Sequence, residues 1–345
     1  MIRDRLYHDW TNRGITGWLT AGLLIWFYVA LYFTESLTPW AQRVGLRSKW
    51  DLYGLLYTLV VVAGGVAVIR KYGHNRYQVV RTAVVMFVQV VFAFSVPMML
   101  QALHQPEYYL SYFWPLKFDY MNPEYLFAQP WPFVVYTLAA SLVGVPLLGA
   151  LFGKRWYCSW VCGCGGLANT AGEPWRHLSD KSSAAWRFEK ISIHAVLGVS
   201  LLLTGLLFYS WFTGSKSPEV VQFQTWYGLV VGSILSGAVG TGLYPLGGTR
   251  VWCRFFCPMA ALLGITQRAG RRFHIRVKED MCISCGLCSK YCEMGIDVRA
   301  YAQRNESFTR ASCVGCGICA EVCPRGVLRL ETQSGLVQIV GVSLS

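Results

Sequence analysis

Long runs of apolar residues dominate the first three quarters of the chain. Six of them approach the roughly 20 residues that a helix needs to cross a lipid bilayer, and none contains Asp, Glu, Lys or Arg. They cover residues 15–33, 52–69, 82–103, 133–152, 191–212 and 229–246. The sixth is short, rich in glycine and ends beside Pro245, where a helix is expected to break. This pattern predicts an all-α polytopic membrane domain of about six transmembrane helices over residues 1–272.

Composition and charge agree with a membrane protein. Of 345 residues only 14% are charged and 54% are hydrophobic, whereas soluble proteins average about 25% charged residues, so a single water-soluble globule is excluded. If the N-terminus is cytoplasmic, 26 of the 31 Lys and Arg residues fall on cytoplasmic segments, as the positive-inside rule requires. Both termini are therefore predicted to be cytoplasmic. No RNA-binding or zinc-finger motif accompanies the formal net charge of +13, so membrane lipid, not nucleic acid, is the predicted partner.

A cysteine pattern occurs twice after residue 272. The spacing C-x2-C-x2-C-x3-C suits 4Fe-4S clusters, because soft thiolates bind iron and the fourth cysteine of each run binds the other cluster in two-cluster ferredoxins. The sequence predicts a small α+β ferredoxin domain of this bacterial type over residues 273–345, with two clusters. The predicted ligands are Cys282, Cys285, Cys288 and Cys323 for one, and Cys313, Cys316, Cys319 and Cys292 for the other. A structural zinc site would instead need separated C-x2-C pairs. Glu293 stands where Pro324 stands in the second run, which changes a local turn without removing a ligand.

A second cysteine repeat follows the fourth and sixth apolar runs. In each copy an arginine, Arg155 or Arg250, precedes the first cysteine by three positions, and a second cysteine follows four positions later. Residues i and i+4 share one face of a helix, so each segment is expected to present a thiol pair at the cytoplasmic border. The pairs predict a third iron-sulfur cluster; a redox-active thiol or disulfide pair and inert thiols are the alternatives. Its ligands would be Cys158, Cys162, Cys253 and Cys257, with Cys164 as a substitute for Cys162. The arginines would stabilise the anionic cluster or anchor helix ends in phosphate headgroups.

These motifs resemble the membrane polyferredoxins of the NapH, NosR and CcoG types, over residues 133 to about 329. The resemblance implies an electron-transfer protein of the cytoplasmic (inner) membrane of a bacterium or archaeon. The run Gly163-Cys164-Gly165-Gly166 departs from the family, which has proline after the second cysteine. The chain also has no counterpart of the extracytoplasmic regions of the NosR and CcoG types. The NapH type is closest in role, and the chain is a distinct branch.

No nucleotide, flavin or covalent haem motif is present, so no catalytic residue is assigned. The predicted function is transfer of electrons between the quinone pool and a redox partner complex, with quinone and other redox subunits as partners. The alternative is an accessory reductase that serves maturation or maintenance of a metalloenzyme. Residues 104–131 carry ten aromatic residues. They are predicted to form an interfacial belt or, alternatively, a lid over a quinone site or a docking face.

Overall fold

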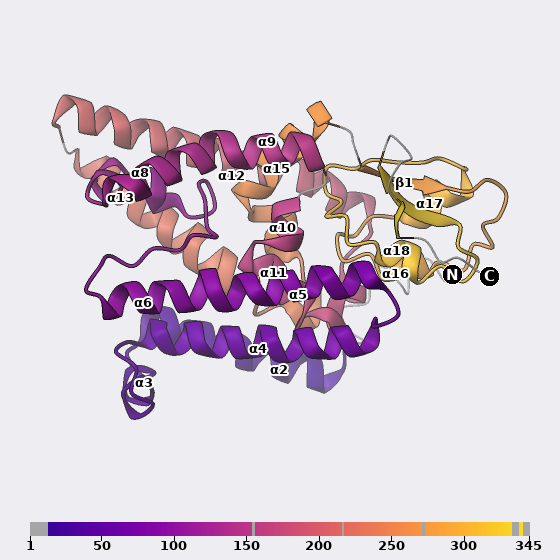
Figure 1. Ribbon diagram of the computed structural model, residues 1–345, viewed down its shortest axis with the longest axis horizontal. Helices are drawn as coiled ribbons and strands as arrows, with labels where there is room; N and C mark the ends of the chain where they lie inside the picture. The colour runs from indigo at the N-terminus through magenta and orange to yellow at the C-terminus, as the bar shows by residue number, and fades with distance from the viewer. Residues whose placement is uncertain (1–12, 154–155, 216, 271–272, 333–337, 341–345) are drawn as a thin grey trace.

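Helices lying side by side make up most of the molecule, and a small region with a β-sheet lies at one end (Figure 1). The structure is a computed structural model that describes residues 13–153, 156–215, 217–270, 273–332 and 338–340. Among these residues, five helices are long and apolar enough to cross a membrane. They are Gly14–Phe33, Lys49–Lys71, Arg76–Ala102, Trp131–Phe152 and Ser183–Thr213. In the labels of Figure 1 these are α2, α4, α5 with α6, α8 with α9, and α12.

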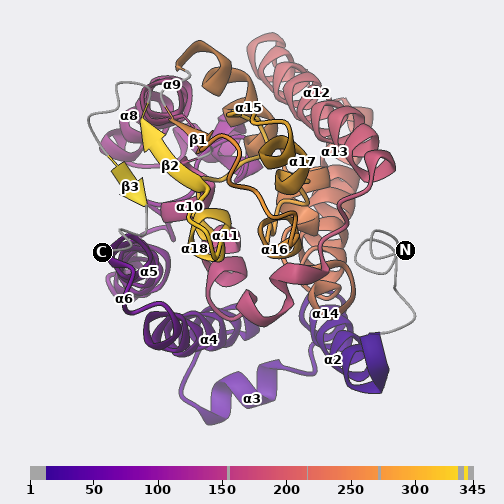
Figure 2. The same ribbon diagram turned by 90° about the vertical axis from the view of Figure 1, so that its right-hand side faces the viewer.

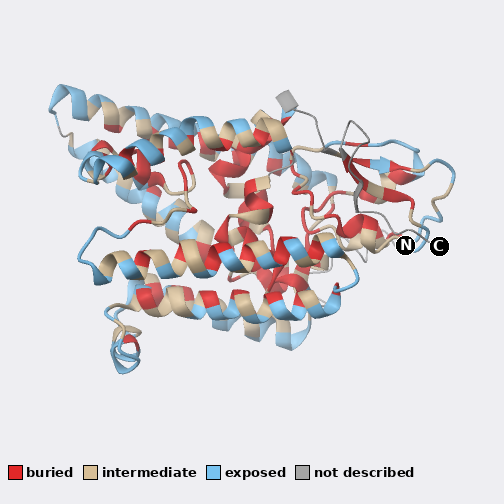
Figure 3. Ribbon diagram, viewed as in Figure 1, coloured by how far each residue is buried: buried red, intermediate tan, exposed pale blue. Residues whose placement is uncertain are grey.

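The outer faces of these helices are exposed along their length (Figure 3). The exposed side chains there are large and apolar, for example Leu19, Trp26 and Leu59, with exposed fractions of 68%, 61% and 55%. Such surfaces are normally covered by lipid or by a partner. The helices therefore carry the apolar exterior that a membrane domain requires.

Two of the five helices contain a wider, π-helical segment. In one, α5 (Arg76–Val90) continues through Val91–Ser95 into α6 (Val96–Ala102). In the other, α8 (Trp131–Leu138) continues through Ala139–Gly144 into α9 (Val145–Phe152). Each π-helical segment ends just before a proline, Pro97 or Pro146. Proline lacks an amide hydrogen and crowds the preceding turn, so the widened turn lets the helix continue.

The sixth predicted span, residues 229–246, does not form one continuous helix and is not among the five. Instead α13 (Pro218–Tyr227) continues as a π-helical segment, Gly228–Val239, which ends in a turn before α14 (Tyr244–Gly247). The glycines of this stretch serve close packing: a Cβ added to Gly237 would lie 2.8 Å from the ring of Tyr28 on α2. The helix breaks where the chain is glycine-rich, close to the predicted break at Pro245.

The chain between α9 and α12 folds back into the helix domain. Its short helices, α10 (Trp156–Trp160) and α11 (Gly163–Asn169), lie between α5 and α12 in Figure 1. A Cβ added to Gly64 of α4 would lie 2.4 Å from the amide nitrogen of Ala171, and one added to Gly166 would lie 2.8 Å from Val85 of α5. Small residues allow this close approach. The first cysteine pair is thus packed inside the protein, and its location at the cytoplasmic border of the membrane stays a prediction.

The C-terminal region is an α+β unit with few strands. β1 (Phe273–Val277) pairs antiparallel with β2 (Leu328–Thr332), with Ile275 opposite Leu330, and β2 pairs with β3 (Gln338–Val340). The same region contains the short helices α16 (Leu287–Lys290), α17 (Val298–Gln303) and α18 (Ile318–Glu321). Gly286 and Gly317 begin α16 and α18 with φ of 80° and 74°, a conformation that favours glycine. Figure 2 shows α16 and α18 over the end of the helix domain. The predicted fold class is confirmed, apart from the number of helices.

Candidate iron-sulfur centres

Four cysteines of the C-terminal region line one cavity, and we call them the first ferredoxin group. They are Cys282, Cys285, Cys288 and Cys323. Burial raises the pKa of the Cys288 thiol to about 12, and the neighbouring thiols of Cys323, Cys285 and Cys282 also contribute to raising this pKa. Iron binds thiolates, so the protons of such buried thiols leave when the metal binds. The structure brings together the set predicted for one cluster.

The second ferredoxin group combines residues of both runs. It consists of Cys313, Cys316, Cys319 and Cys292. Burial raises the pKa of Cys319, and the thiols of Cys316, Cys313 and Cys292 raise it further. Among the described residues, no three His, Cys, Asp or Glu side chains converge closely enough to hold a single metal ion. Four soft thiolates are the donors that iron-sulfur clusters use, so the donor set fits a cluster.

A third set, the helix-domain group, is buried among the helices. It consists of Cys158, Cys162, Cys253 and Cys257, with exposed fractions of 2%, 5%, 4% and 3%. Burial raises the pKa of Cys257, and the thiols of Cys158, Cys253 and Cys162 raise it further. Cys164 differs from these four because it is partly exposed and lines a separate, aromatic cavity. Its hydrogen bond with Cys162, together with burial, raises the pKa of Cys162.

The two cysteine pairs of the helix-domain group have the same backbone arrangement. The first cysteine of each lies in a short helix, α10 or the π-helical segment Trp252–Phe256, and the second lies in extended backbone after it. Cys162 has φ −66° and ψ 128°, and Cys257 has φ −81° and ψ 113°. The prediction of pairs on one helix face is wrong, because the chain leaves the helix between them. Gly163 begins α11 where Pro258 begins α15 (Pro258–Gly270), so Cys162, not Cys164, is the counterpart of Cys257.

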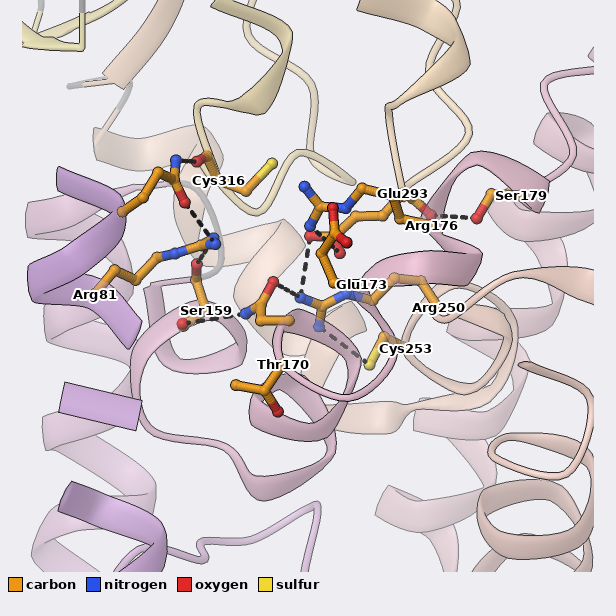
Figure 4. A network of polar contacts seen from close by, with 12 residues as sticks. Arg81, Ser159, Thr170, Glu173, Arg176, Ser179, Arg250, Cys253, Glu293 and Cys316 are labelled. Carbon is orange, nitrogen blue, oxygen red and sulfur yellow. Dashed lines mark hydrogen bonds and ion pairs between the residues drawn. The ribbon is translucent and has the colours of Figure 1, made fainter. Parts of the chain in front are cut away.

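Arg250 is a buried contact of this group, with a side-chain exposure of 0%. Its guanidinium donates to Cys253 Sγ at 3.7 Å (Figure 4). It also donates to the carbonyl oxygen of Cys158 at 3.4 Å. A second nitrogen donates to Asn169 Oδ1 at 2.9 Å. The predicted alternative that Arg250 anchors a helix end in phosphate headgroups is therefore wrong. Its positive charge instead offsets the negative charge of nearby thiolates. Arg155 lies outside the described residues.

Glu293 links Arg250 to the C-terminal region. One carboxylate oxygen accepts from Arg250 Nη2 at 3.1 Å and the other from Arg176 Nη2 at 3.1 Å, and the side chain is 1% exposed (Figure 4). Ser179 Oγ also donates to the backbone carbonyl of Glu293 at 2.6 Å. Burial alone would raise the pKa of Glu293, but Arg250 and Arg176 outweigh it and lower the pKa to about 2. The sequence analysis treated Glu293 only as a local change and missed this role, because its partners lie 43 and 117 residues away.

Side chains at the N-terminal end of α5 donate hydrogen bonds to the second cysteine run. Tyr77 donates its hydroxyl to the carbonyl of Gly315 at 2.7 Å, and Gln78 Nε2 donates to the carbonyl of Cys316 at 2.5 Å. The Gln78 amide oxygen in turn accepts from Arg81 Nη2 at 2.9 Å. Hydrogen bonds to backbone carbonyls fix the loop without using the sulfur atoms. The helix domain therefore orients the loop that carries the second ferredoxin group.

The fold and these cysteine groups define a ferredoxin-type iron-sulfur protein whose cluster-binding region is packed on apolar, membrane-capable helices. Comparison with known families agrees: the family described as "4Fe-4S dicluster domain" matches residues 275–330, which include both ferredoxin groups. A second family, described as "4Fe-4S binding domain", matches residues 134–181 and 227–276, which include the two pairs of the helix-domain group. These matches support the predicted resemblance to the membrane polyferredoxins and indicate 4Fe-4S clusters as the cofactors.

Individual relatives carry names from redox systems. The methylamine utilization ferredoxin-type protein MauN of Methylobacillus flagellatus is 30% identical over 44% of this chain and 54% of its own length. MauN of Paracoccus denitrificans is 30% identical over 47% of this chain and 56% of its own length. The regulatory protein NosR of Pseudomonas aeruginosa is 26% identical over 51% of this chain and 24% of its own length. The chain thus spans about half the length of these MauN proteins and a quarter of NosR. No solved structure matches it.

Proposed function

We propose that the eight cysteines of the C-terminal region hold two 4Fe-4S clusters in a crossed arrangement. One cluster takes the first ferredoxin group as ligands and the other takes the second. The cavity lined by Cys323 together with three cysteines of the other run supports the first set. The second is supported by Cys316 and Cys313, the thiols that raise the pKa of Cys292. Each bound cluster supplies one-electron chemistry at a potential set by burial and hydrogen bonding.

We propose further that the helix-domain group holds a third iron-sulfur cluster. The burial of all four thiols and their mutual effect on one pKa support this assignment, as does the "4Fe-4S binding domain" family that matches both segments. Arg250 would offset the negative charge of this site through its contact with Cys253 Sγ. Cys162 is the proposed ligand, and Cys164 is not.

The proposed location is the cytoplasmic membrane of a bacterium or archaeon, with both termini in the cytoplasm. Five apolar helices support membrane insertion, and the distribution of Lys and Arg supports the orientation. The helical stretch formed by α13 and the π-helical segment Gly228–Val239 is the proposed sixth crossing. In this arrangement residues 1–272 form the membrane domain, and residues 273–345 form a ferredoxin domain that faces the cytoplasm.

We propose that the chain passes electrons between the quinone pool and a redox partner complex. The observation that carries this proposal is the buried contact in which Arg250 touches Cys253 Sγ with one nitrogen and Glu293 with the other. Glu293 directly follows Cys292 of the second ferredoxin group. One arginine therefore connects the helix-domain group with the residue next to a ferredoxin ligand, which supports the close spacing that electron transfer between neighbouring centres needs.

Reoxidation of the reduced protein by quinone tests this route. The purified full-length protein is reduced with dithionite and mixed with a short-chain ubiquinone or menaquinone analogue, and the return of iron-sulfur absorbance is followed by stopped flow. We expect rapid reoxidation in the wild type and at least tenfold slower reoxidation in Cys253→Ser. Equal rates in Cys253→Ser and the wild type would refute a route through the helix-domain group. A wild type that neither quinone reoxidises would refute the quinone link itself.

Purification from native membranes in mild detergent, followed by mass spectrometry, tests the partner. Stoichiometric recovery of a dehydrogenase, reductase or multihaem cytochrome would support the electron-transfer subunit proposed here. Recovery only with metal-handling or biogenesis proteins would instead favour the accessory role in metalloenzyme maturation.

A further inference from the structure

A cavity of about 210 Å³ lies inside the helix domain beside Cys164. Its walls come from α2, α4, the stretch from α5 to α6, the loop before α7 (Pro123–Phe127), α11, and the π-helical segment Gly228–Val239 with the turn after it. Six tyrosines, Trp50 and Phe94 line it. An engineered apolar cavity of about 150 Å³ holds benzene, so this space accepts one substituted aromatic ring.

Two polar atoms meet at the inner end of the cavity, next to the helix-domain group. A Cβ added to Gly163 would lie 2.4 Å from the Tyr112 hydroxyl and 3.3 Å from Gln89 Oε1. Gln89 is 6% exposed, and its Nε2 donates to Thr58 Oγ1 at 3.1 Å. Within the described part of the chain its Oε1 accepts no hydrogen bond. A buried carbonyl oxygen is costly to leave unpaired, so this end of the cavity suits a ligand with a hydroxyl group.

The outer end of the cavity carries two carboxylates. Asp51, near the start of α4, and Glu107, in the loop after α6, both line it. Tyr109, which also lines the cavity, donates its hydroxyl to Glu107. In Figure 1 this end of α4, next to α3 (Thr38–Arg43), points away from the β-sheet. The cavity therefore has proton acceptors at the end remote from the ferredoxin region.

We propose that this cavity binds the ring of a quinone and of its hydroquinone. The inference rests on the proposed function and adds to it a binding site and a proton route. Aromatic side chains stack on a flat ring. The Tyr112 hydroxyl donates to one ring oxygen, and Gln89 Oε1 accepts from a hydroxyl of the hydroquinone. The ring is thereby held near Cys164, which lines the cavity and lies two residues after Cys162.

The chemical step at this site balances as follows. Oxidation of the hydroquinone breaks two O–H bonds, releases two protons and two electrons, and leaves the quinone. Bound 4Fe-4S clusters would be the oxidant and would accept the electrons one at a time, and Cys162 of the helix-domain group would hold the cluster beside the cavity. The protons pass to the carboxylates of Glu107 and Asp51, away from the ferredoxin region. Quinone reduction is the same step in reverse.

Filling the cavity tests the inference by a binding measurement. A Cβ at Gly54 on α4 would lie 3.5 Å from Phe94 in the cavity wall, so Gly54→Leu occupies the space. Gly205 on α12 has no atom within 4 Å of such a Cβ, which makes Gly205→Leu the matched control. Binding of a short-chain ubiquinone or menaquinone analogue to the oxidised full-length protein is measured by calorimetry against protein-free micelles. We expect at least tenfold weaker binding in Gly54→Leu and a change of less than twofold in Gly205→Leu.

A single-atom change tests the polar end. Tyr112→Phe removes the donor to the ring and should weaken binding about fivefold, the value of one hydrogen bond. Tyr136→Phe is its control, because the Tyr136 hydroxyl donates to the carbonyl of Leu110 at 2.7 Å and does not line the cavity. Iron content equal to the wild type shows that each variant is folded.

Unchanged affinity in both Gly54→Leu and Tyr112→Phe would overturn the site. If the wild type is still reoxidised by quinone in that case, the proposed function stands and the ring binds elsewhere. A wild type that neither binds quinone nor is reoxidised by it would overturn the proposed quinone link as well.

Discussion

Replacing Glu293 with glutamine removes the one negative charge that Arg176 and Arg250 share, while the shape of the side chain is kept. Both ion pairs are 3.1 Å long, and all three side chains are at most 1% exposed. Removing one member of a buried ion pair leaves uncompensated buried charge and costs about 3–5 kcal/mol. Total stabilities are about 5–15 kcal/mol, so the loss is a large share of the whole.

An exposed ion pair of the same region is the matched control. Glu306 accepts from Arg304 Nε at 2.9 Å, but both side chains are 53% exposed. Solvent screens such a pair, and its contribution is about 0–1 kcal/mol. Glu306→Gln therefore removes a carboxylate from the same C-terminal region with little expected effect.

The assay is the melting temperature of the cluster-loaded protein in detergent, with iron content measured on the same samples. We expect Glu293→Gln to lower the melting temperature by roughly 10 °C and Glu306→Gln to change it by a few degrees at most. The double variant Arg176→Gln with Glu293→Gln should lose less than the sum of the two single losses, because it removes both partners. Equal melting temperatures for Glu293→Gln and Glu306→Gln, or strictly additive losses, would refute the assignment of a coupled buried network.

Two further predictions follow from the helix domain. Cys162→Ser should lower the iron content from about twelve to about eight atoms per chain, whereas Cys164→Ser should leave it unchanged; iron and acid-labile sulfide analysis decides, and equal loss in both variants would contradict the assignment of Cys162. Gly64→Ala should destabilise the protein by about 1–3 kcal/mol, because its Cβ would lie 2.4 Å from the Ala171 backbone nitrogen, whereas Gly205→Ala has open space and should not. Equal melting temperatures for these two variants would argue against the close packing of the segment between α9 and α12 on α4.

Periodicity and spacing predicted the parts of the structure that depend on near neighbours in sequence. Five apolar runs formed helices whose bounds lie within eight residues of those predicted, since length and composition alone decide that a segment is long and apolar enough. The repeated Cys-Gly-x-Cys pattern gave the same positive-φ turn at Gly286 and Gly317. Local chemistry was sufficient for these features.

Features that depend on distant partners were not predictable. Each cysteine pair of the helix-domain group was expected on one helix face, but the chain leaves the helix between the two cysteines. Gly64 and Gly166 allow the segment that carries the first pair to pack closely against α4 and α5. Arg250 was assigned an alternative role at the lipid surface because its buried partner, Glu293, is 43 residues away. Spacing identifies which cysteines belong to one pattern, but it does not indicate how deeply the fold buries them.

The departures from the repeated pattern mark the contacts that the pattern cannot encode. Proline follows the last cysteine of two of the four motifs, at Pro258 and Pro324, and the other two have Gly163 and Glu293 in that position. A side chain at Gly163 would meet the Tyr112 hydroxyl, and Glu293 joins two buried arginines. At each of these two positions the proline that would make the turn rigid is absent, and another part of the chain approaches the neighbouring cysteine. Local rules are expected to fail where a site makes its functional contacts. The two positions without proline therefore indicate where the cysteine groups face the aromatic cavity and where they face each other.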